Sequence, residues 1–169
     1  MSIDAKKRIM FVPSDDFNFL SYTLLVTLKA LACTNKKQML RDVRKLAPIS
    51  SIIGLPQMEY LIFSSQESSE MRGILPKLWA QTKKKEPLYQ RITYALGKKG
   101  IVGIDFDEKS NCKCVFLQRE DMVNKLIESH LFDVEVRNVE IISKMIPRIR
   151  SIKYETLMER LLPYAGTFL

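Results

Sequence analysis

The stretch Pro87–Leu117 constrains the fold of this 169-residue chain more than any other part of its sequence. It begins with an amphipathic segment, PLYQRITYALGKK, in which Pro87 suits the first turn of a helix and Gly100 suits its end. Two β-rich segments follow, IVGIDF and CKCVFL, separated by the polar turn DEKSN. A helix that leads directly into a β-hairpin predicts a winged helix. Modules of this kind usually hold DNA or another protein and seldom catalyse a reaction.

A long apolar segment near the N-terminus predicts the centre of the fold. Ser14 is a suitable N-cap, and the helix that it begins should run to about Ala32. Apolar residues follow helical spacing and also lie beyond that stripe, so the helix is apolar over most of its circumference. Such a helix is buried on more than one side, either inside the domain or beneath a partner subunit. We expect the central position.

The next segments predict shorter helices. The basic segment KKQMLRDVRKL should form a helix that ends before Pro48, because the residue before a proline avoids the α region. Beyond it, one turn at 49–53, a short helix at 57–63, a loop at 64–70 and a helix at 71–83 are expected. After the hairpin, helices are expected at 119–129, 134–146 and 153–162. Their expected inward residues are Met122, Val123, Leu126, Val139, Ile142, Ile146, Ile149, Leu157, Met158, Leu161 and Leu162.

The sequence therefore predicts a mainly α protein with a small antiparallel β-ribbon. We expect a single domain over 1–169, with a winged-helix-like core at 14–117 that carries a helical insertion at about 49–82, and a C-terminal helical extension at 119–169. The 46% hydrophobic and 27% charged residues are ordinary for a globular protein. Three cysteines favour a reducing cytoplasm, and we expect no secretory signal and no membrane span.

The net charge of +8 is unevenly distributed along the chain. Residues 1–100 hold 17 Lys and Arg against 8 Asp and Glu, a balance of +9, whereas residues 101–169 hold 10 against 11, a balance of −1. The basic excess therefore belongs to the part that ends at the hairpin. It favours a polyanion or an acidic partner near that part, and the alternative is a solvated basic surface.

The residues that could carry chemistry do not form a recognisable catalytic or metal motif. Cys112 and Cys114 would need Cys33 and His130 to complete a zinc site, but a C-x-C spacing is not the usual C-x₂₋₄-C, and we expect buried thiols instead. His130, the only histidine, lacks a nucleophile in a recognisable context and should flank the end of a helix.

The turn of the hairpin resembles a calcium loop only superficially. Asp105, Asp107 and Asn111 alternate with other residues, but Lys109 stands where an oxygen ligand is needed. The chain also contains no phosphate-binding glycine loop and no GxSxG motif. We therefore expect no enzyme, no metal and no cofactor, and an enzyme with an unrecognised site is the alternative.

A helical wheel of 87–99 describes how the helix before the hairpin could meet DNA. Leu88, Ile92, Ala95 and Leu96 form the expected buried stripe, and the exposed face presents Gln90, Thr93, Tyr94 and Gly97. Only Gln90 suits base recognition, and the acidic hairpin tip disfavours phosphate. Non-specific contact is better supported, and the residues expected to provide it are Lys83, Lys84, Lys85, Arg91, Lys98 and Lys99.

The order of these parts resembles the small middle component of bacterial three-component ABC/SMC-type anti-phage systems, such as Lamassu. The resemblance rests on the apolar first helix NFLSYTLLVTLKALACT, the basic segment KKQMLRDVRKL, an irregular helical insertion, the segment LYQRITYALGKKGIVGIDFD and C-terminal helices. It covers about three-quarters of the chain and includes no catalytic signature.

The resemblance implies a kleisin-like subunit that binds an SMC-like ATPase and couples DNA sensing to an effector nuclease in antiviral defence. ATP hydrolysis and cleavage would belong to those other subunits. Apolar side chains on the first and last helices would be the docking surfaces, a choice made from their apolar character rather than from a family motif. They are Phe17, Phe19, Val26, Leu157, Met158 and Leu161. The alternative is a free-standing, dimeric winged-helix transcription regulator.

Overall fold

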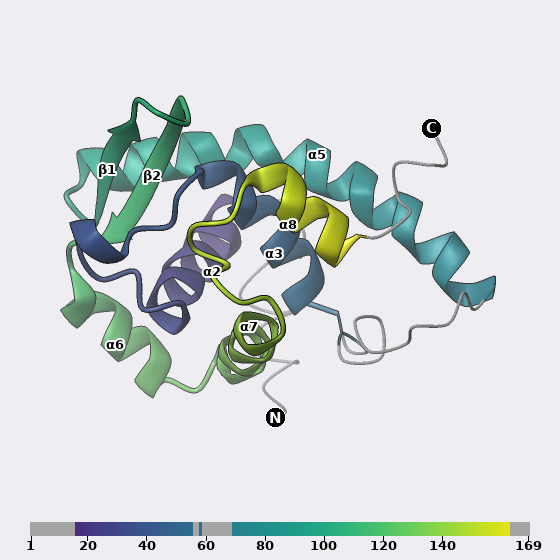
Figure 1. Cartoon of the computed structure of the whole chain (residues 1–169). Coiled ribbons are helices and arrows are strands. Elements are labelled where there is room, and N and C mark those ends of the chain that lie inside the picture. Colours follow the sequence, from purple (N-terminus) through teal and green to yellow (C-terminus); the bar gives the residue numbers. More distant parts are fainter. Residues whose placement is uncertain (1–15, 56–57, 59–68, 163–169) are drawn as a thin grey trace.

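The computed structural model describes residues 16–55, 58 and 69–162. These residues form a mostly helical structure with one small antiparallel sheet, which confirms the predicted class (Figure 1). The predicted cap at Ser14 and most of the predicted helix at 57–63 lie outside the described residues. Among those described, no helix combines the length and apolar character that a membrane span requires.

Helix α2 (Phe17–Ala30) lies at the centre of the fold, as the sequence predicts. Asp16 caps it, because its carboxylate accepts hydrogen bonds from the backbone N–H groups of Asn18 at 2.7 Å and Phe19 at 3.0 Å. Residues 20 to 28 of this helix are all buried except Tyr22. The helix contacts four other helices and one strand, so its nearly all-round apolar surface is covered by the chain itself.

The predicted basic helix over residues 36–46 is wrong. The segment instead forms two short 3-10 turns, η1 (Lys36–Gln38) and η2 (Val43–Lys45), joined by an extended residue, Leu40. The backbone of Leu40 exchanges two hydrogen bonds with Val115 of the hairpin, at 2.9 and 3.0 Å. Continued helix would forfeit this pairing. The contact joins residues far apart in sequence, so local helical periodicity could not reveal it.

Helix α3 (Leu46–Ile53) begins directly after η2, and its eight residues are all buried. It is longer than the single turn expected at 49–53, and it contains Pro48, before which a helix was predicted to end. Pro48 lies in the first turn, where a backbone N–H has no partner within the helix, so its missing donor costs no helical hydrogen bond.

Helix α5 (Ser69–Lys98) is a single helix of 30 residues, not two helices separated by a break before Pro87. Both Pro76 and Pro87 lie inside it. Pro87 is on the exposed side, where the carbonyl that loses its helical partner can bond to water. The inner side of the same region buries Tyr89, Ile92 and Leu96, so packing holds the helix together across the proline.

Strands β1 (Val102–Asp107) and β2 (Cys112–Leu117) form the predicted hairpin. They pair in register from Val102 opposite Leu117 to Asp107 opposite Cys112. Gly100 joins α5 to β1 with φ +67°, a conformation that favours glycine. The order α2, extended Leu40, α3, α5 and hairpin, with Leu40 pairing to the second strand, is winged-helix-like.

Three helices follow the hairpin close to the predicted positions: α6 (Glu120–Glu128), α7 (Asp133–Met145) and α8 (Tyr154–Leu161). The predicted inward positions of α7 and the residues after it are confirmed by burial of Val139, Ile142, Ile146 and Ile149. In α6, Val123 is buried, but Met122 is 45% exposed, so its predicted inward position is wrong. Because α6 is short and contacts the rest chiefly through α2, only part of its apolar face is covered.

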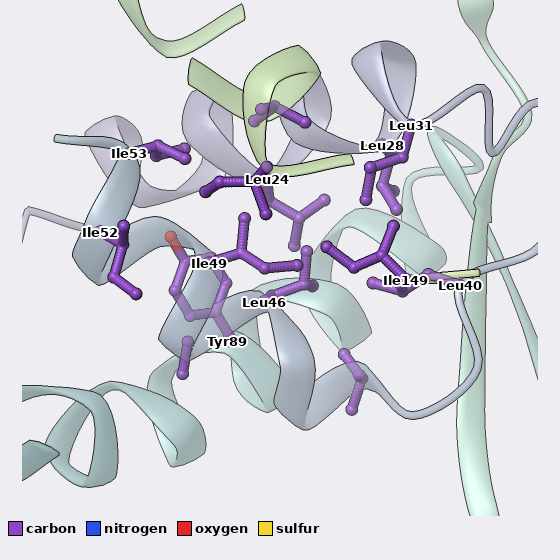
Figure 2. Close-up of a cluster of buried hydrophobic side chains, with 14 of the residues drawn as sticks. Leu24, Leu28, Leu31, Leu40, Leu46, Ile49, Ile52, Ile53, Tyr89 and Ile149 are labelled. Carbon is purple, nitrogen blue, oxygen red and sulfur yellow. The ribbon is translucent and has the colours of Figure 1, made fainter. Parts of the chain in front are cut away.

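The main hydrophobic core joins residues from α2, α3, α5, the hairpin and the C-terminal helices. Figure 2 shows Leu24 and Leu28 of α2 facing Leu46 and Ile49 of α3, with the ring of Tyr89 from α5 among them. The burial of α7 and α8 residues in this same cluster shows that the C-terminal helices complete the core of the winged-helix-like part.

Thr93 is buried, although the helical wheel places it on the exposed face. Its side chain is 3% exposed and its hydroxyl has no hydrogen-bond partner among the described residues. Thr93→Val keeps the shape and removes a buried polar group without a partner, so it should raise the free energy of unfolding by about 1 kcal/mol. Chemical denaturation measures this change, with Thr93→Ser as the control that keeps the hydroxyl. Loss of stability in Thr93→Val would contradict this prediction.

Candidate functional site

The outer face of α5 carries a regular row of cations. Lys77, Lys84, Arg91 and Lys98 occur at every seventh position of the helix, and all four are exposed. Residues seven apart are displaced by about 20° around a helix, so the four side chains lie within a sector of about 60°. We call these four residues the basic ridge.

The three consecutive lysines of α5, which the sequence analysis grouped as one basic surface, lie on different sides of the helix. Lys84 belongs to the basic ridge, whereas Lys85 is half-buried and about 100° farther around the helix. Lys83 points toward α8. Its ammonium donates to Glu86 of α5 at 2.9 Å and to the hydroxyl of Tyr154 in α8 at 3.0 Å. Lys83 therefore contributes to packing between helices.

The expected base-reading face is smaller than the helical wheel indicates. Gln90 and Tyr94 are exposed as predicted, but Thr93 is buried, and Gly97 is half-buried beneath Ile104 of β1. A Cβ on Gly97 would come within 2.8 Å of the Ile104 side chain, so glycine allows the hairpin to pack on α5. The predicted stripe also shifts, because Leu88 and Ala95 are only half-buried and Tyr89 is fully buried.

Lys98 and Lys99 end the basic surface beside the hairpin. The Lys98 ammonium lies 4.8 Å from the centre of the Tyr94 ring, a cation–π arrangement on a ring that is 61% exposed. Lys99 directly follows the helix and is exposed. Both residues stand where the sequence analysis expects contact with a polyanion.

The tip of the hairpin is acidic. Asp105 forms an ion pair with Lys36 at 3.1 Å, and the hydrogen bond from Lys36 lowers the pKa of Asp105 below its usual range. Asp107 accepts a hydrogen bond from the Ser110 hydroxyl at 2.7 Å, which lowers its pKa as well. These carboxylates remain charged at neutral pH, so the tip disfavours approach of a phosphate.

A wide groove of about 1030 Å³ lies between the hairpin, the segment from η1 to η2, and the start of α8. Phe106, 53% exposed, forms part of its wall. The lining carries both signs of charge, which does not match a uniform anion site. The cations are Arg41, Arg44, Lys109 and Lys153, and the anions are Asp42, Asp107, Glu108 and Glu155.

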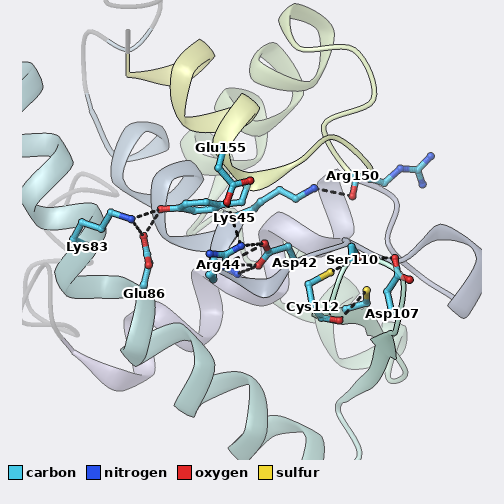
Figure 3. A network of polar contacts seen from close by, with 12 residues as sticks. Asp42, Arg44, Lys45, Lys83, Glu86, Asp107, Ser110, Cys112, Arg150 and Glu155 are labelled. Carbon is cyan, nitrogen blue, oxygen red and sulfur yellow. Dashed lines mark hydrogen bonds and ion pairs between the residues drawn. The ribbon is translucent and has the colours of Figure 1, made fainter. Parts of the chain in front are cut away.

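A polar network on one side of this groove holds α8 in place (Figure 3). Arg44 donates to both carboxylate oxygens of Asp42 at 2.6 to 3.0 Å, and it lies 3.6 Å from Glu155. Its guanidinium is 4.5 Å from the centre of the Tyr154 ring. The Tyr154 hydroxyl in turn donates to Glu86 and accepts from Lys83 on α5. The network therefore joins η2, α5 and α8.

Tyr154→Phe should weaken this junction. Burial, followed by the bond to Glu86, raises the pKa of Tyr154 to about 12, so the hydroxyl is protonated at neutral pH and can donate. The variant removes the hydroxyl and both of its bonds, although Lys83 and Glu86 can still pair with each other. We expect the free energy of unfolding to fall by about 1 kcal/mol and exchange of α8 amide hydrogens to accelerate. Unchanged stability and unchanged exchange would contradict this role.

Lys45 is fully buried, which is rare for a lysine. Its ammonium donates to the backbone carbonyls of Ile149 at 3.1 Å and Arg150 at 3.0 Å, in the segment between α7 and α8. Burial disfavours the charged form and lowers the pKa of Lys45 to about 8, while nearby Asp42 opposes this change.

The lowered pKa of Lys45 makes its contribution to stability depend on pH. Between about pH 8 and 10.5 the unfolded chain holds more of this proton than the folded chain, so the contribution rises with pH across that window. Relative to Lys45→Met, which cannot titrate, the wild-type free energy of unfolding should rise by roughly 3 kcal/mol over this range. Denaturant titrations of both proteins at several pH values measure the difference. A flat or falling difference would be the contrary result.

Cys33 and Cys114 are buried, and His130 contacts Asp133 at a helix end. Burial raises the pKa of Cys33 to about 12 and also raises that of Cys114, so both thiols stay protonated and poorly nucleophilic at neutral pH. Within the described ranges, no three His, Cys, Asp or Glu side chains are grouped to hold a metal. His130 lies between α6 and α7 with φ +55° and contacts Asp133 at 3.0 Å, which places it at a helix end as predicted.

The expected partner-binding residues fall into two groups. Phe17 is 47% exposed, and Phe19 and Met158 are half-buried, so part of each is accessible. Val26, Leu157 and Leu161 are buried in the chain's own core, which leaves them no surface to offer a partner in this structure. Apolar character alone did not separate these groups, because core and docking side chains share it.

Lys77 is the ridge residue that the sequence analysis missed. Its seven-residue spacing to Lys84, Arg91 and Lys98 is visible in the sequence, but it has meaning only if one helix spans all four positions. The expected break before Pro87 concealed that relation. The contact between Arg44 and the Tyr154 ring was also not predicted. It joins segments far apart in the chain, so no local sequence pattern indicates it.

The fold and these surfaces define a mainly helical protein with a winged-helix-like arrangement and a basic outer helix face. Comparison of the chain with protein-family models, with curated proteins and with solved structures found no match.

Proposed function

We propose that the protein is a non-enzymatic, kleisin-like accessory subunit of an SMC-like ATPase and nuclease complex in anti-phage or anti-plasmid defence. In this role it bridges the ATPase and the effector nuclease and contacts DNA without reading its sequence. The ATPase and nuclease are the partners that the resemblance in the sequence implies.

The observation that carries this proposal is the winged-helix-like arrangement with cations along the exposed side of its last helix, α5. The inner side of α5 is fixed in the core by Tyr89 and Ile92, so the outer side is presented on a rigid support. A rigid, charged surface without grouped reacting side chains suits binding and assembly. Lys45 and Cys33 carry groups that could react, but both are buried and donate to backbone carbonyls.

The alternative function, a dimeric transcription regulator, draws on the same arrangement and on the exposed Gln90. A glutamine can pair with an adenine edge, but sequence-specific recognition usually takes several such side chains. Here Thr93 and Gly97 are covered and the hairpin tip is acidic. Specific duplex binding that persists at physiological salt would favour the regulator over the proposed subunit.

Co-expression with the products of neighbouring genes tests the proposed function. We expect the protein to co-purify in fixed stoichiometry with an SMC-like ATPase encoded beside it. Phe17→Ser should reduce the co-purified fraction several-fold, because an exposed aromatic anchor contributes strongly to binding. Met122→Ser is the matched control, since Met122 is similarly exposed but lies on α6. A monodisperse monomer that retains none of the products of its own operon would refute the proposal.

A further inference from the structure

We infer that the basic ridge binds the phosphate backbone of duplex nucleic acid along the whole length from Lys77 to Lys98, independently of base sequence. This inference deepens the proposed function, on which it rests for its biological setting, by naming the ligand of α5 and extending the site to Lys77. It can be tested on the isolated chain.

The geometry of the ridge favours an extended ligand. Neighbouring cations are separated by about 10.5 Å along the helix axis, and the first and last by about 31 Å. That length corresponds to roughly nine base pairs of duplex DNA at 3.4 Å each. A small phosphate compound could reach only one of the four cations, whereas a nucleic-acid backbone can meet all of them.

From Gly73 to Lys98, the charge on the outer face of α5 is of one sign. From Gly73 onward, Glu86 is the one acidic side chain among the described side chains of α5, and it is half-buried in bonds to Lys83 and Tyr154. It therefore faces α8 and does not neutralise the ridge. Between Gly73 and Lys98, the described part of this helix therefore presents the cations on a surface without an opposing carboxylate.

Other classes of ligand fit the ridge less well. A protein partner or a membrane surface needs apolar anchors, and among the exposed residues between Lys77 and Arg91 only Ala80 and Pro87 are apolar. A single-stranded nucleic acid is bound largely by stacking on aromatic rings. Tyr94 is the single aromatic residue on the outer side of the described helix, and Lys98 already contacts its ring. A duplex backbone can be bound through cations without aromatic stacking.

The hairpin next to the ridge restricts the direction of the ligand. Asp105 and Asp107 stay ionised at the tip, so a duplex that lay across the hairpin would bring phosphates toward carboxylates. Lys77 marks the opposite direction, along α5 and away from the hairpin, and Figure 1 shows the helix continuing that way past α8 and α3. We therefore expect a duplex to follow α5 from Lys98 toward Lys77, away from the hairpin tip.

The salt dependence of duplex binding tests the inference. Each cation that neutralises a phosphate contributes about −0.9 to the slope of log K against log salt, so four contacts predict a slope near −3.6. Anisotropy of a labelled 20-base-pair duplex between 50 and 200 mM KCl measures it. We expect the triple variant Lys77→Ala, Lys84→Ala, Arg91→Ala to flatten the slope by about 2.7, and Lys77→Ala alone by about 0.9. Alanine favours helix, so these variants should fold.

The matched control removes the same charge elsewhere: Lys37→Ala, Lys125→Ala, Lys144→Ala, at three exposed lysines of η1, α6 and α7. Its slope should stay close to that of the wild type, and two duplexes of unrelated sequence should bind alike. Equal slopes for the ridge variant and the wild type would overturn the inference. So would equal flattening by the control, tighter binding of a 20-nucleotide single strand, or no duplex binding at 50 mM KCl. Failure to co-purify with an ATPase would instead refute the complex and leave the ridge intact.

Discussion

The burial of one side of α5 against α2 and α3 is the contact on which the rest of the structure depends. Tyr89, Ile92 and Leu96 fill the core from this helix, and the same helix leads through Gly100 into the hairpin. Because apolar burial fixes the inner side, the position of every outer side chain follows from helical geometry. The placement of the basic ridge is therefore a consequence of packing on the inner side of α5.

Polar contacts determine where the C-terminal helices lie on this frame. Apolar packing is strong but non-directional, whereas Arg44, Tyr154 and Glu86 join only in one arrangement of η2, α8 and α5. Lys45 adds a second fixed point through the carbonyls of Ile149 and Arg150. A buried ammonium is costly unless it is bonded, so the segment between α7 and α8 cannot move away freely.

Local sequence patterns predicted the elements that depend on local interactions. The hairpin, α7 and α8 follow from alternation, periodicity and turn residues, and their bounds agree closely with the prediction. The segment over 36–46 was mispredicted because its decisive hydrogen bonds run from Leu40 to Val115 in the hairpin. At Pro87 the local rule predicts a helix boundary that is absent, because tertiary packing keeps α5 continuous there.

The candidate site was predictable only in part. Gln90, Arg91 and Lys98 lie on the exposed side as expected, because the helical wheel of 87–99 is correct to within one residue. Lys77 required knowledge that α5 is continuous. Val26 and Leu157 could not be distinguished from docking residues, because burial depends on neighbours that the sequence does not place.

The continuity of α5 unites the core, the hairpin and the ridge, and a distance between the two ends of the ridge tests it most directly. Spin labels on cysteines introduced at 77 and 98, in a Cys112→Ser background, allow that distance to be measured by pulsed electron paramagnetic resonance. A continuous helix predicts one narrow distribution centred near 31 Å. A broad distribution, or one centred well below this value, would show that the helix breaks at Pro87 and would contradict the proposed surface.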